Sequence, residues 1–335
     1  MNSNRKIPPQ WKRWIAENKM LQVEDEHILA VLRQNGFDEE VAKRQLSFVS
    51  KTHSYKAGTW VAQRCRKLES LLEVYRQLSM LSDRTIERRK NLSRAEFCER
   101  YYSANRPVII THAMHGWKAL ASWNPDYFKR EFGDLTVEIT AGRSSDKRYE
   151  LNLEKHRLEI SFRDYIDMVL SGGETNDYYM VANNFFFKHD AAKRLCEDIE
   201  QFSEYLDESQ PAHNALFWFG PAGTITPLHH DLMNLLIAQV YGRKKFLLIP
   251  SNHTHLLYNE KGVFSEVDLD DIDLDRHPLF KDVRPIEILL EPGEVLFVPV
   301  GWWHHVRALD ISISVSFTNF VFPNVYNWNH PQIYR

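Results

Sequence analysis

Cysteine is scarce in this chain. Three cysteines occur in 335 residues, Cys65, Cys98 and Cys196, and no two of them have the close spacing of a CxxC motif. An odd number of widely separated thiols argues against a disulfide framework and against a cysteine-ligated zinc site. We therefore expect a protein of a reducing compartment and predict a cytoplasmic location.

The chain also contains little glycine and proline, has a small net charge and has no long apolar run. Thirteen glycines and fourteen prolines are too few for a collagen-like or disordered chain. A net charge of −3 gives no overall basic field, and no basic-aromatic tract indicates nucleic-acid binding. The apolar runs 232–240 and 295–300 are far shorter than the ~20 residues of a membrane span. The N-terminal string MNSNRKIPPQWKRW lacks the apolar core of a secretory signal, so we expect a soluble globular protein without membrane association.

Residues 1–90 have the periodicity of helices, and we predict a separate N-terminal helical region there. Apolar residues recur at three- and four-residue spacings over 28–49. Asn35-Gly36 is a helix stop signal, and Asp38 is a suitable N-cap for the next helix. A longer amphipathic stretch follows over 60–81. We expect its apolar stripe to pack on the other helices and on the rest of the chain, and a partner-binding or dimerising module is the alternative. The stripe consists of Val61, Leu68, Leu71, Leu72, Tyr75 and Leu78.

The remainder, residues 91–335, becomes rich in strands from Ala215 onward. Turn signals such as Pro221-Ala222-Gly223 and Glu291-Pro292-Gly293 separate short β-branched and apolar segments. Many short strands at this spacing predict a sandwich or a barrel. These strands are expected over 216–219, 235–241, 245–249, 286–290, 295–300 and 311–317. The preceding part is expected to contain helices around 96–102, 117–132 and 162–170 and strands over 108–110, 135–139 and 177–181.

The string TPLHHD contains the most informative spacing in the sequence. Residues two apart in a strand point to the same face, so His229 and Asp231 would converge while His230 faces away. The second string, PGEVLFVPVGWWHH, follows a tight turn with a predicted strand and ends with His304 and His305. Two histidines and one carboxylate form the facial triad of non-haem Fe(II) oxygenases. Spacing does not choose between the last two histidines, and a chance HxD triplet among fifteen histidines is the alternative.

Two long strings resemble the motifs of a known enzyme family. TPLHHDLMNLLIAQVYGRKKFLLIP and PGEVLFVPVGWWHHVRALDISISVSF are similar to the two metal motifs of the JmjC, or cupin-like, Fe(II)- and 2-oxoglutarate-dependent dioxygenases. The string RPVIITHAMHGWKALASWNPDYFKREFGDLTVEI resembles the entry to the same domain, and the resemblance covers about residues 93–320. The asparaginyl and arginyl JmjC protein hydroxylases are the most similar branch. The resemblance implies a mainly β domain over 91–335, a double-stranded β-helix or jelly-roll barrel with flanking helices.

The resemblance also implies the roles of the histidines. It makes His229, Asp231 and His304 the iron ligands, which bind Fe(II) and leave further coordination sites for 2-oxoglutarate and dioxygen. It places His230 and His305 at positions that do not bind the metal.

The cosubstrate residues follow from the same motifs. Lys244, fifteen residues after the first histidine ligand, matches the lysine that pairs with the distal carboxylate of 2-oxoglutarate, where an unpaired buried charge would be costly. Thr226 matches a hydroxyl that hydrogen-bonds this carboxylate, and Tyr179 matches a tyrosine that contacts the cosubstrate. Asn234 lies one place before the family's asparagine, so either a bulge brings it to the cosubstrate or the contact is lost. Ser316 stands where the asparaginyl hydroxylases have asparagine and the arginyl hydroxylases have serine.

The resemblance implies a dioxygenase that uses Fe(II), 2-oxoglutarate and dioxygen to hydroxylate an unactivated C–H bond. A protein or peptide side chain is the favoured substrate, because the most similar motifs belong to protein hydroxylases. A small metabolite or natural-product intermediate is the main alternative. N-methyl-lysine demethylation and a non-catalytic metal-binding scaffold are further alternatives, although no chromatin-reading module or zinc-finger spacing accompanies the barrel. A homodimer through the helical regions is the remaining partner prediction.

Overall fold

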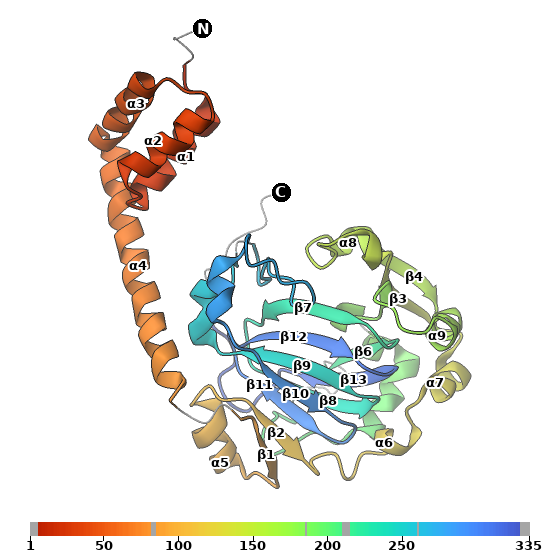
Figure 1. Ribbon diagram of the computed structural model, residues 1–335. Coiled ribbons are helices and arrows are strands. Elements are labelled where there is room, and N and C mark those ends of the chain that lie inside the picture. Colours follow the sequence, from red (N-terminus) through yellow and green to blue (C-terminus); the bar gives the residue numbers. More distant parts are fainter. Residues whose placement is uncertain (1–5, 82–84, 185, 210–214, 260, 329–335) are drawn as a thin grey trace. The chain divides into compact units, whose positions relative to one another are not determined.

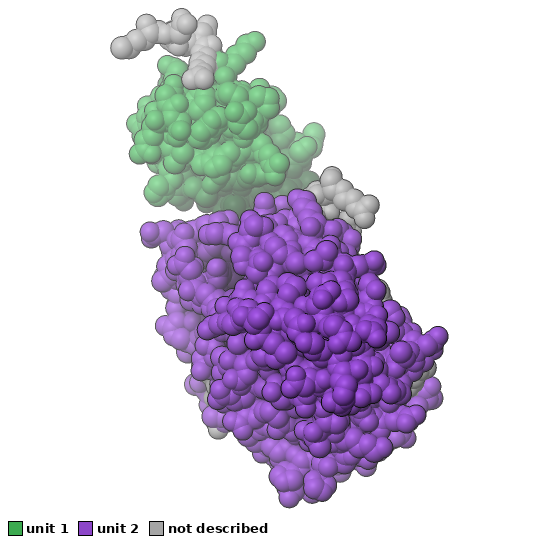
Figure 2. Space-filling view, turned by 90° about the vertical axis from the view of Figure 1, so that its right-hand side faces the viewer, with its two compact units in different colours: residues 1–78 green, residues 79–335 purple. Residues whose placement is uncertain are grey.

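The structure is a computed structural model that describes residues 6–81, 85–184, 186–209, 215–259 and 261–328. The chain divides into two compact units, Met1–Leu78 and Ser79–Arg335, which are coloured separately in Figure 2. The division lies before the predicted boundary at residue 90, because strand β1 (Glu87–Lys90) pairs in parallel with β2 (Val108–Thr111) and belongs to the second unit. No described helix combines the length and apolar character needed to cross a membrane.

The first unit contains a three-helix bundle and a long fourth helix. Asn35 ends the second helix, and Gly36 adopts a φ of +80° immediately after it. The side chain of Asp38 accepts a hydrogen bond from the Val41 amide at 3.0 Å and caps the third helix. The predicted helix stop and N-cap are therefore confirmed. The helices of this unit are α1 (Pro9–Met20), α2 (Asp25–Gln34), α3 (Glu39–Lys51) and α4 (His53–Ser79).

Helix α4 does not bury its apolar stripe within this unit. None of its residues is buried, and Val61, Leu68 and Leu71 are each about half exposed. The apolar side chains of α1, α2 and α3 already form a closed core, and only Tyr55, in the first turn of α4, packs against it. The expectation that the stripe packs on the other helices of the region is therefore wrong.

Two sheets of the second unit form the predicted jelly-roll barrel (Figure 1). Apolar side chains from both sheets, such as Ile237, Phe246 and Leu296, meet in one cluster between them. The six-stranded sheet has the order β1, β2, β11 (Val295–Val298), β8 (Leu235–Tyr241), β13 (Ser312–Phe317) and β6 (Leu216–Gly220). The four-stranded sheet has the order β10 (Ile286–Leu290), β9 (Lys244–Ile249), β12 (Trp303–Ala308) and β7 (Ile225–His230).

Helices and a small third sheet flank the barrel. The predicted helix over 117–132 is divided into two helices, because Asn124 accepts a hydrogen bond from the Tyr127 amide as an N-cap and Pro125 begins the second helix. The helices are α5 (Arg94–Phe97), continued by a π-helical turn η1 (Cys98–Tyr102), α6 (Ala119–Ser122), α7 (Pro125–Phe132), α8 (Leu153–His156) and α9 (Phe162–Ser171). The third sheet has the order β4 (Arg157–Ser161), β3 (Thr136–Ala141) and β5 (Tyr178–Tyr179).

Candidate active site

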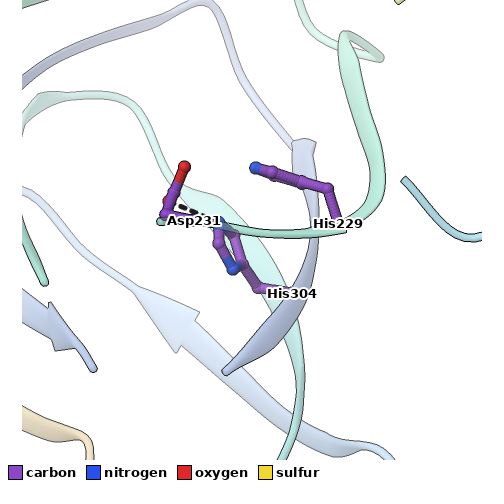
Figure 3. Close-up of side chains that lie close together, drawn as sticks. All are labelled: His229, Asp231 and His304. Atoms are coloured by element: carbon purple, nitrogen blue, oxygen red, sulfur yellow. Dashed lines mark ion pairs between the residues drawn. The ribbon is translucent and has the colours of Figure 1, made fainter. Parts of the chain in front are cut away.

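Two neighbouring strands bring three potential metal ligands together (Figure 3). Strand β7 carries His229, Asp231 directly follows this strand, and β12 carries His304. The two histidines are direct partners in the antiparallel register, and their ring centroids lie 4.1 Å apart. One ligand atom from each of the three residues lies within 4.8 Å of the others. This separation allows all three side chains to bind a single ion.

The backbone orients both imidazole rings. Nδ1 of His229 lies 2.8 Å from the carbonyl oxygen of Pro227, and Nδ1 of His304 lies 3.1 Å from that of Trp302. A carbonyl oxygen only accepts hydrogen bonds, so Nδ1 is the donor in both rings and each Nε2 keeps a free lone pair. The resulting tautomer is the one that metal-binding histidines adopt when a second group fixes their orientation.

Desolvation disfavours charge on Asp231 and His304. It raises the pKa of the Asp231 carboxyl group, although 35% of this side chain is exposed. Burial lowers the pKa of the His304 imidazole well below its usual range, and the nearby His229 lowers it further. A bound divalent cation would stabilise the ionised carboxylate, and two imidazole nitrogens with one carboxylate are a donor set that suits Fe(II).

The two adjacent histidines do not join this group. The ring of His230 packs against Trp328 with a centroid distance of 5.0 Å. Nε2 of His305 lies 3.7 Å from a carboxylate oxygen of Asp270. The structure therefore brings His304, and not His305, to the pair that the first motif supplies.

The three converging side chains line a cavity of about 460 Å³ between the two barrel sheets, and Lys244 lines the same cavity. Nζ of Lys244 donates hydrogen bonds to the hydroxyl groups of Ser314, at 2.7 Å, and Tyr179, at 3.1 Å. Side chains alternate along β9, so Lys245 points away from the cavity and pairs with Glu287 at 3.8 Å. Within the described part of the chain, no carboxylate lies within ion-pair distance of Lys244.

Burial without a charged partner lowers the pKa of Lys244 to about 7. An anionic ligand beside its Nζ would raise this pKa again, because the opposite charge stabilises the ammonium form. Ser314, which hydrogen-bonds this lysine, was not singled out by the sequence motifs. Lys244 therefore lies in the cavity wall with the metal ligands, and its binding of a ligand carboxylate, which the resemblance implies, stays a prediction.

The predicted cosubstrate residues Tyr179, Thr226 and Ser316 also line the cavity. Tyr179 accepts a hydrogen bond from Lys244. The hydroxyl group of Ser316 accepts a hydrogen bond of 2.8 Å from Nε1 of Trp218 and so holds this indole ring in the cavity wall. Their contribution to cosubstrate binding stays a prediction.

Asn234 does not line the cavity, so of the two alternatives for this residue the structure favours the lost contact over a bulge that brings it to the cosubstrate. Its Oδ1 accepts a hydrogen bond from the Val300 amide at 2.8 Å, and its Nδ2 donates to Asn324 Oδ1 at 2.9 Å and to the Tyr326 hydroxyl at 3.0 Å. Asn324 in turn donates to the Asn234 carbonyl oxygen at 3.0 Å. These bonds hold the loop that follows Asp231 against the C-terminal segment, and they occupy both N–H donors of the Asn234 side chain.

A buried ion pair near the metal ligands was missed by the sequence motifs. Arg143 lies 3.1 Å from Glu150, which lines the cavity, and it donates a second hydrogen bond of 2.6 Å to the carbonyl oxygen of Ile225 in β7. Burial raises the pKa of Glu150, while Arg143 opposes the shift. Both residues lie in an irregular segment after β3, where no periodicity indicates burial, so only the fold reveals the pair.

Phe264 is a further residue of the cavity wall that the sequence did not indicate. It lies in the connection between β9 and β10, forms a backbone bridge with His229, and stacks on the imidazole ring with a centroid distance of 5.5 Å. The apolar ring covers one side of a metal ligand, which restricts the access of water and of bulky groups to that side.

Comparison with known proteins leads to the same family as the site geometry. The family profile described as a cupin-like domain matches residues 93–321, which contain every strand of the barrel except β1. The chain belongs to the JmjC branch of this cupin-like family.

Relatives of this JmjC protein include demethylases by name. Lysine-specific demethylase JMJ30 of Arabidopsis thaliana is 34% identical over 71% of the chain and 55% of the relative. Lysine-specific demethylase 8 of Danio rerio is 34% identical over 65% of the chain and 54% of the relative. Arginine-specific demethylase JMJ20 of Arabidopsis thaliana is 29% identical over 71% of the chain and 56% of the relative. The chain thus spans about half the length of these relatives.

JmjC oxygenases of the cupin-like family use Fe(II), 2-oxoglutarate and dioxygen. The residues of this JmjC protein fit these groups. The imidazole nitrogens of His229 and His304 and the carboxylate of Asp231 suit the iron. The ammonium group of Lys244, whose hydrogen-bond partners are the Tyr179 and Ser314 hydroxyl groups, suits a carboxylate of the cosubstrate.

Proposed function

We propose that this JmjC oxygenase hydroxylates an unactivated C–H bond on the side chain of a protein or peptide. The observation that carries the proposal is a single cavity that contains both the converging ligand atoms of His229, Asp231 and His304 and the buried Lys244. The relatives named as lysine- and arginine-specific demethylases support a protein side chain as the substrate. The cytoplasmic location expected from the cysteine content stays a prediction.

Each residue of the site has a definite task in this reaction. His229, His304 and Asp231 would hold the iron, with the backbone carbonyls of Pro227 and Trp302 keeping both Nε2 atoms directed at it. When bound, Fe(II) and 2-oxoglutarate supply the oxidising chemistry that converts dioxygen and the C–H bond into an alcohol, with succinate and carbon dioxide as coproducts.

The remaining residues bind, orient and shield. Lys244 would donate hydrogen bonds to the distal carboxylate of the cosubstrate, while Ser314 and Tyr179 fix the position of its Nζ. Phe264 and the apolar cavity wall limit the entry of water. No side-chain general base is required, because the C–H bond is not broken by proton transfer.

Removal of an N-methyl group is a second candidate, favoured by the printed names of the relatives. It uses the same chemistry, since hydroxylation of an N-methyl carbon gives an unstable product that releases formaldehyde. The two candidates differ in the substrate carbon and therefore in the mass change of the substrate.

The test begins with the purified full chain, Fe(II), 2-oxoglutarate and air, with succinate as the readout. Unmodified and N-methylated peptide libraries are then added and analysed by mass spectrometry. The gain of one oxygen atom on unmodified peptides supports the proposal, whereas loss of methyl groups with formaldehyde supports demethylation. Absence of succinate, or equal succinate from a His304→Ala variant, contradicts an oxygenase. Turnover stimulated by metabolite fractions but not by peptides contradicts the protein substrate.

A further inference from the structure

Helix α4 carries an apolar stripe that no other helix of the first unit covers. Seven of its large apolar side chains are each at least 46% exposed, and these seven are the exposed part of the stripe. They are Trp60, Val61, Leu68, Leu71, Val74, Tyr75 and Leu78. The opposite side of the helix is in use within the unit, where Arg66 donates a hydrogen bond of 2.9 Å to Gln22. Contiguous apolar surface of this extent commonly marks an interaction site in a soluble protein.

The stripe has the seven-residue repeat of a coiled coil. Val61, Leu68 and Tyr75 are separated by seven residues and occupy one core position of the repeat. Leu71 and Leu78 occupy the other core position. A helix with the same repeat is the natural partner, because its core side chains insert between those of the stripe, and a second copy of α4 has this repeat by definition.

We propose that the stripe docks against α4 of a second copy of this chain, with the two helices antiparallel. Arg64 decides the direction, since it occupies the core position that precedes Leu71 by seven residues. Parallel pairing would bring Arg64 against the partner's Arg64, two like charges. Antiparallel pairing instead brings Arg64 against the partner's Tyr75, where a guanidinium group and an aromatic ring attract each other. Arg64 already makes such a contact within its own helix, 5.6 Å from the centre of the Trp60 ring.

The antiparallel register also pairs the other core residues. Leu68 meets the partner's Leu71 and Val61 meets the partner's Leu78, because the members of each pair lie at equal distances from the middle of the stripe. Covering the exposed parts of seven large side chains removes on the order of 600 Å² of surface from each copy, which reaches the ~1,200 Å² in total that specific interfaces need. The area is at the lower end of that range, so we expect a dimer that dissociates on dilution.

Sedimentation equilibrium of the full chain over a range of concentrations tests the dimer. Leu71→Glu should raise the dissociation constant at least tenfold, because it places a carboxylate in the seam. Leu170→Glu is the matched control, since Leu170 is also a helix residue with 46% exposure but lies in α9, and it should leave the constant unchanged. Circular dichroism of both variants checks that their helices remain folded. A monomer at every concentration, or a dimer unaffected by Leu71→Glu, would overturn the proposal.

Disulfide trapping tests the direction of the helices in a Cys65→Ser background. The antiparallel register predicts that Val61→Cys combined with Leu78→Cys forms a disulfide between chains. Val61→Cys alone should not, because the two copies of residue 61 would lie about 25 Å apart along the helix axis, beyond the reach of a disulfide. A disulfide in the single variant would overturn the antiparallel arrangement.

Discussion

The two units of this protein use their apolar residues in different ways. In the second unit, side chains such as Phe246, Ile288 and Leu296 from two sheets meet in one cluster, so the apolar face of each sheet is covered by the other. In the first unit, α1–α3 close a core around Ile15 and Leu32, and α4 leaves its stripe exposed. The difference shows that periodicity predicts which face of an element is apolar, while the neighbours of that face depend on the rest of the fold.

Side chains that are adjacent in sequence also point in more clearly different directions in the barrel strands than in helix α4. Strand alternation sends neighbouring side chains to opposite faces of a sheet, as it does for Lys244 and Lys245. On helix α4, residues that are adjacent in sequence lie on the same or on adjoining faces, so the boundary between apolar and polar side chains is less sharp. Single substitutions of two adjacent barrel residues, measured side by side, therefore test most directly how the barrel differs from α4.

The largest effect is expected at the metal ligands. His304→Ala should abolish Fe(II) binding and turnover, because only one histidine and one carboxylate of the three converging ligands remain. His305→Ala should retain most of both, since His305 lies outside the converging group. Anaerobic Fe(II) titration together with succinate formation measures the two effects. Equal losses in both variants would show that alternation along β12 does not separate their roles.

A smaller effect is expected at the cosubstrate anchor. Lys244→Ala should weaken 2-oxoglutarate binding by on the order of a hundredfold or more, because leaving a buried carboxylate unpaired costs about 3–5 kcal/mol and each 1.4 kcal/mol is about tenfold. Iron binding should persist, and Lys245→Ala should be nearly neutral. Anaerobic titration of 2-oxoglutarate with Fe(II) present compares the variants. Unchanged affinity in Lys244→Ala would refute the assignment of this lysine.

The pH dependence of cosubstrate affinity is the next effect in size. Burial lowers the pKa of Lys244 to about 7, so the free protein loses the ammonium proton as the pH rises above 7, and binding of the anion must then take a proton up. The dissociation constant for 2-oxoglutarate should therefore increase by about tenfold per pH unit above pH 7 until the pKa of the bound form is reached.

Lys244→Arg provides the control for this pH effect. A guanidinium group stays protonated over the whole range, so the variant should bind with an affinity that is lower overall but nearly independent of pH. An equally flat profile for the unchanged protein between pH 7 and 9 would show that Lys244 keeps its proton without the cosubstrate.

The smallest effect on the active site is expected from the first unit. Leu32→Ala removes a fully buried side chain of the bundle and should destabilise that unit by about 2–5 kcal/mol. Hydrogen exchange measured by mass spectrometry should show lost protection in α1–α3 and unchanged protection in β7 and β12. Affinity for 2-oxoglutarate should not change. Loss of protection throughout the barrel would show that the two units unfold together.

Much of the barrel and its metal site could be predicted from local sequence. The strands show alternating apolar and polar residues or short buried apolar runs, and turns with glycine and proline separate them. The HxD spacing places two ligands on one face, because the side-chain period of a strand is two. The resemblance of the two metal motifs supplied the third ligand and Lys244. The sequence left the role of Asn234 open, because its partner Asn324 is distant in sequence and no local pattern indicates their hydrogen bonds.

Short-range periodicity and motif spacing determined most of the helices and strands, the sandwich or barrel class and the pairing of His229 with Asp231. The resemblance to the family added the jelly-roll barrel and His304. Only the tertiary structure paired Arg143 with Glu150 and placed Phe264 on the ring of His229. It also brought His304 to His229 and Asp231, as the resemblance implies. It also left the stripe of α4 without cover in its own unit. These features depend on contacts between segments that are remote along the chain or on the exact register of paired strands. The local pattern of a single segment specifies neither the contacts nor the register.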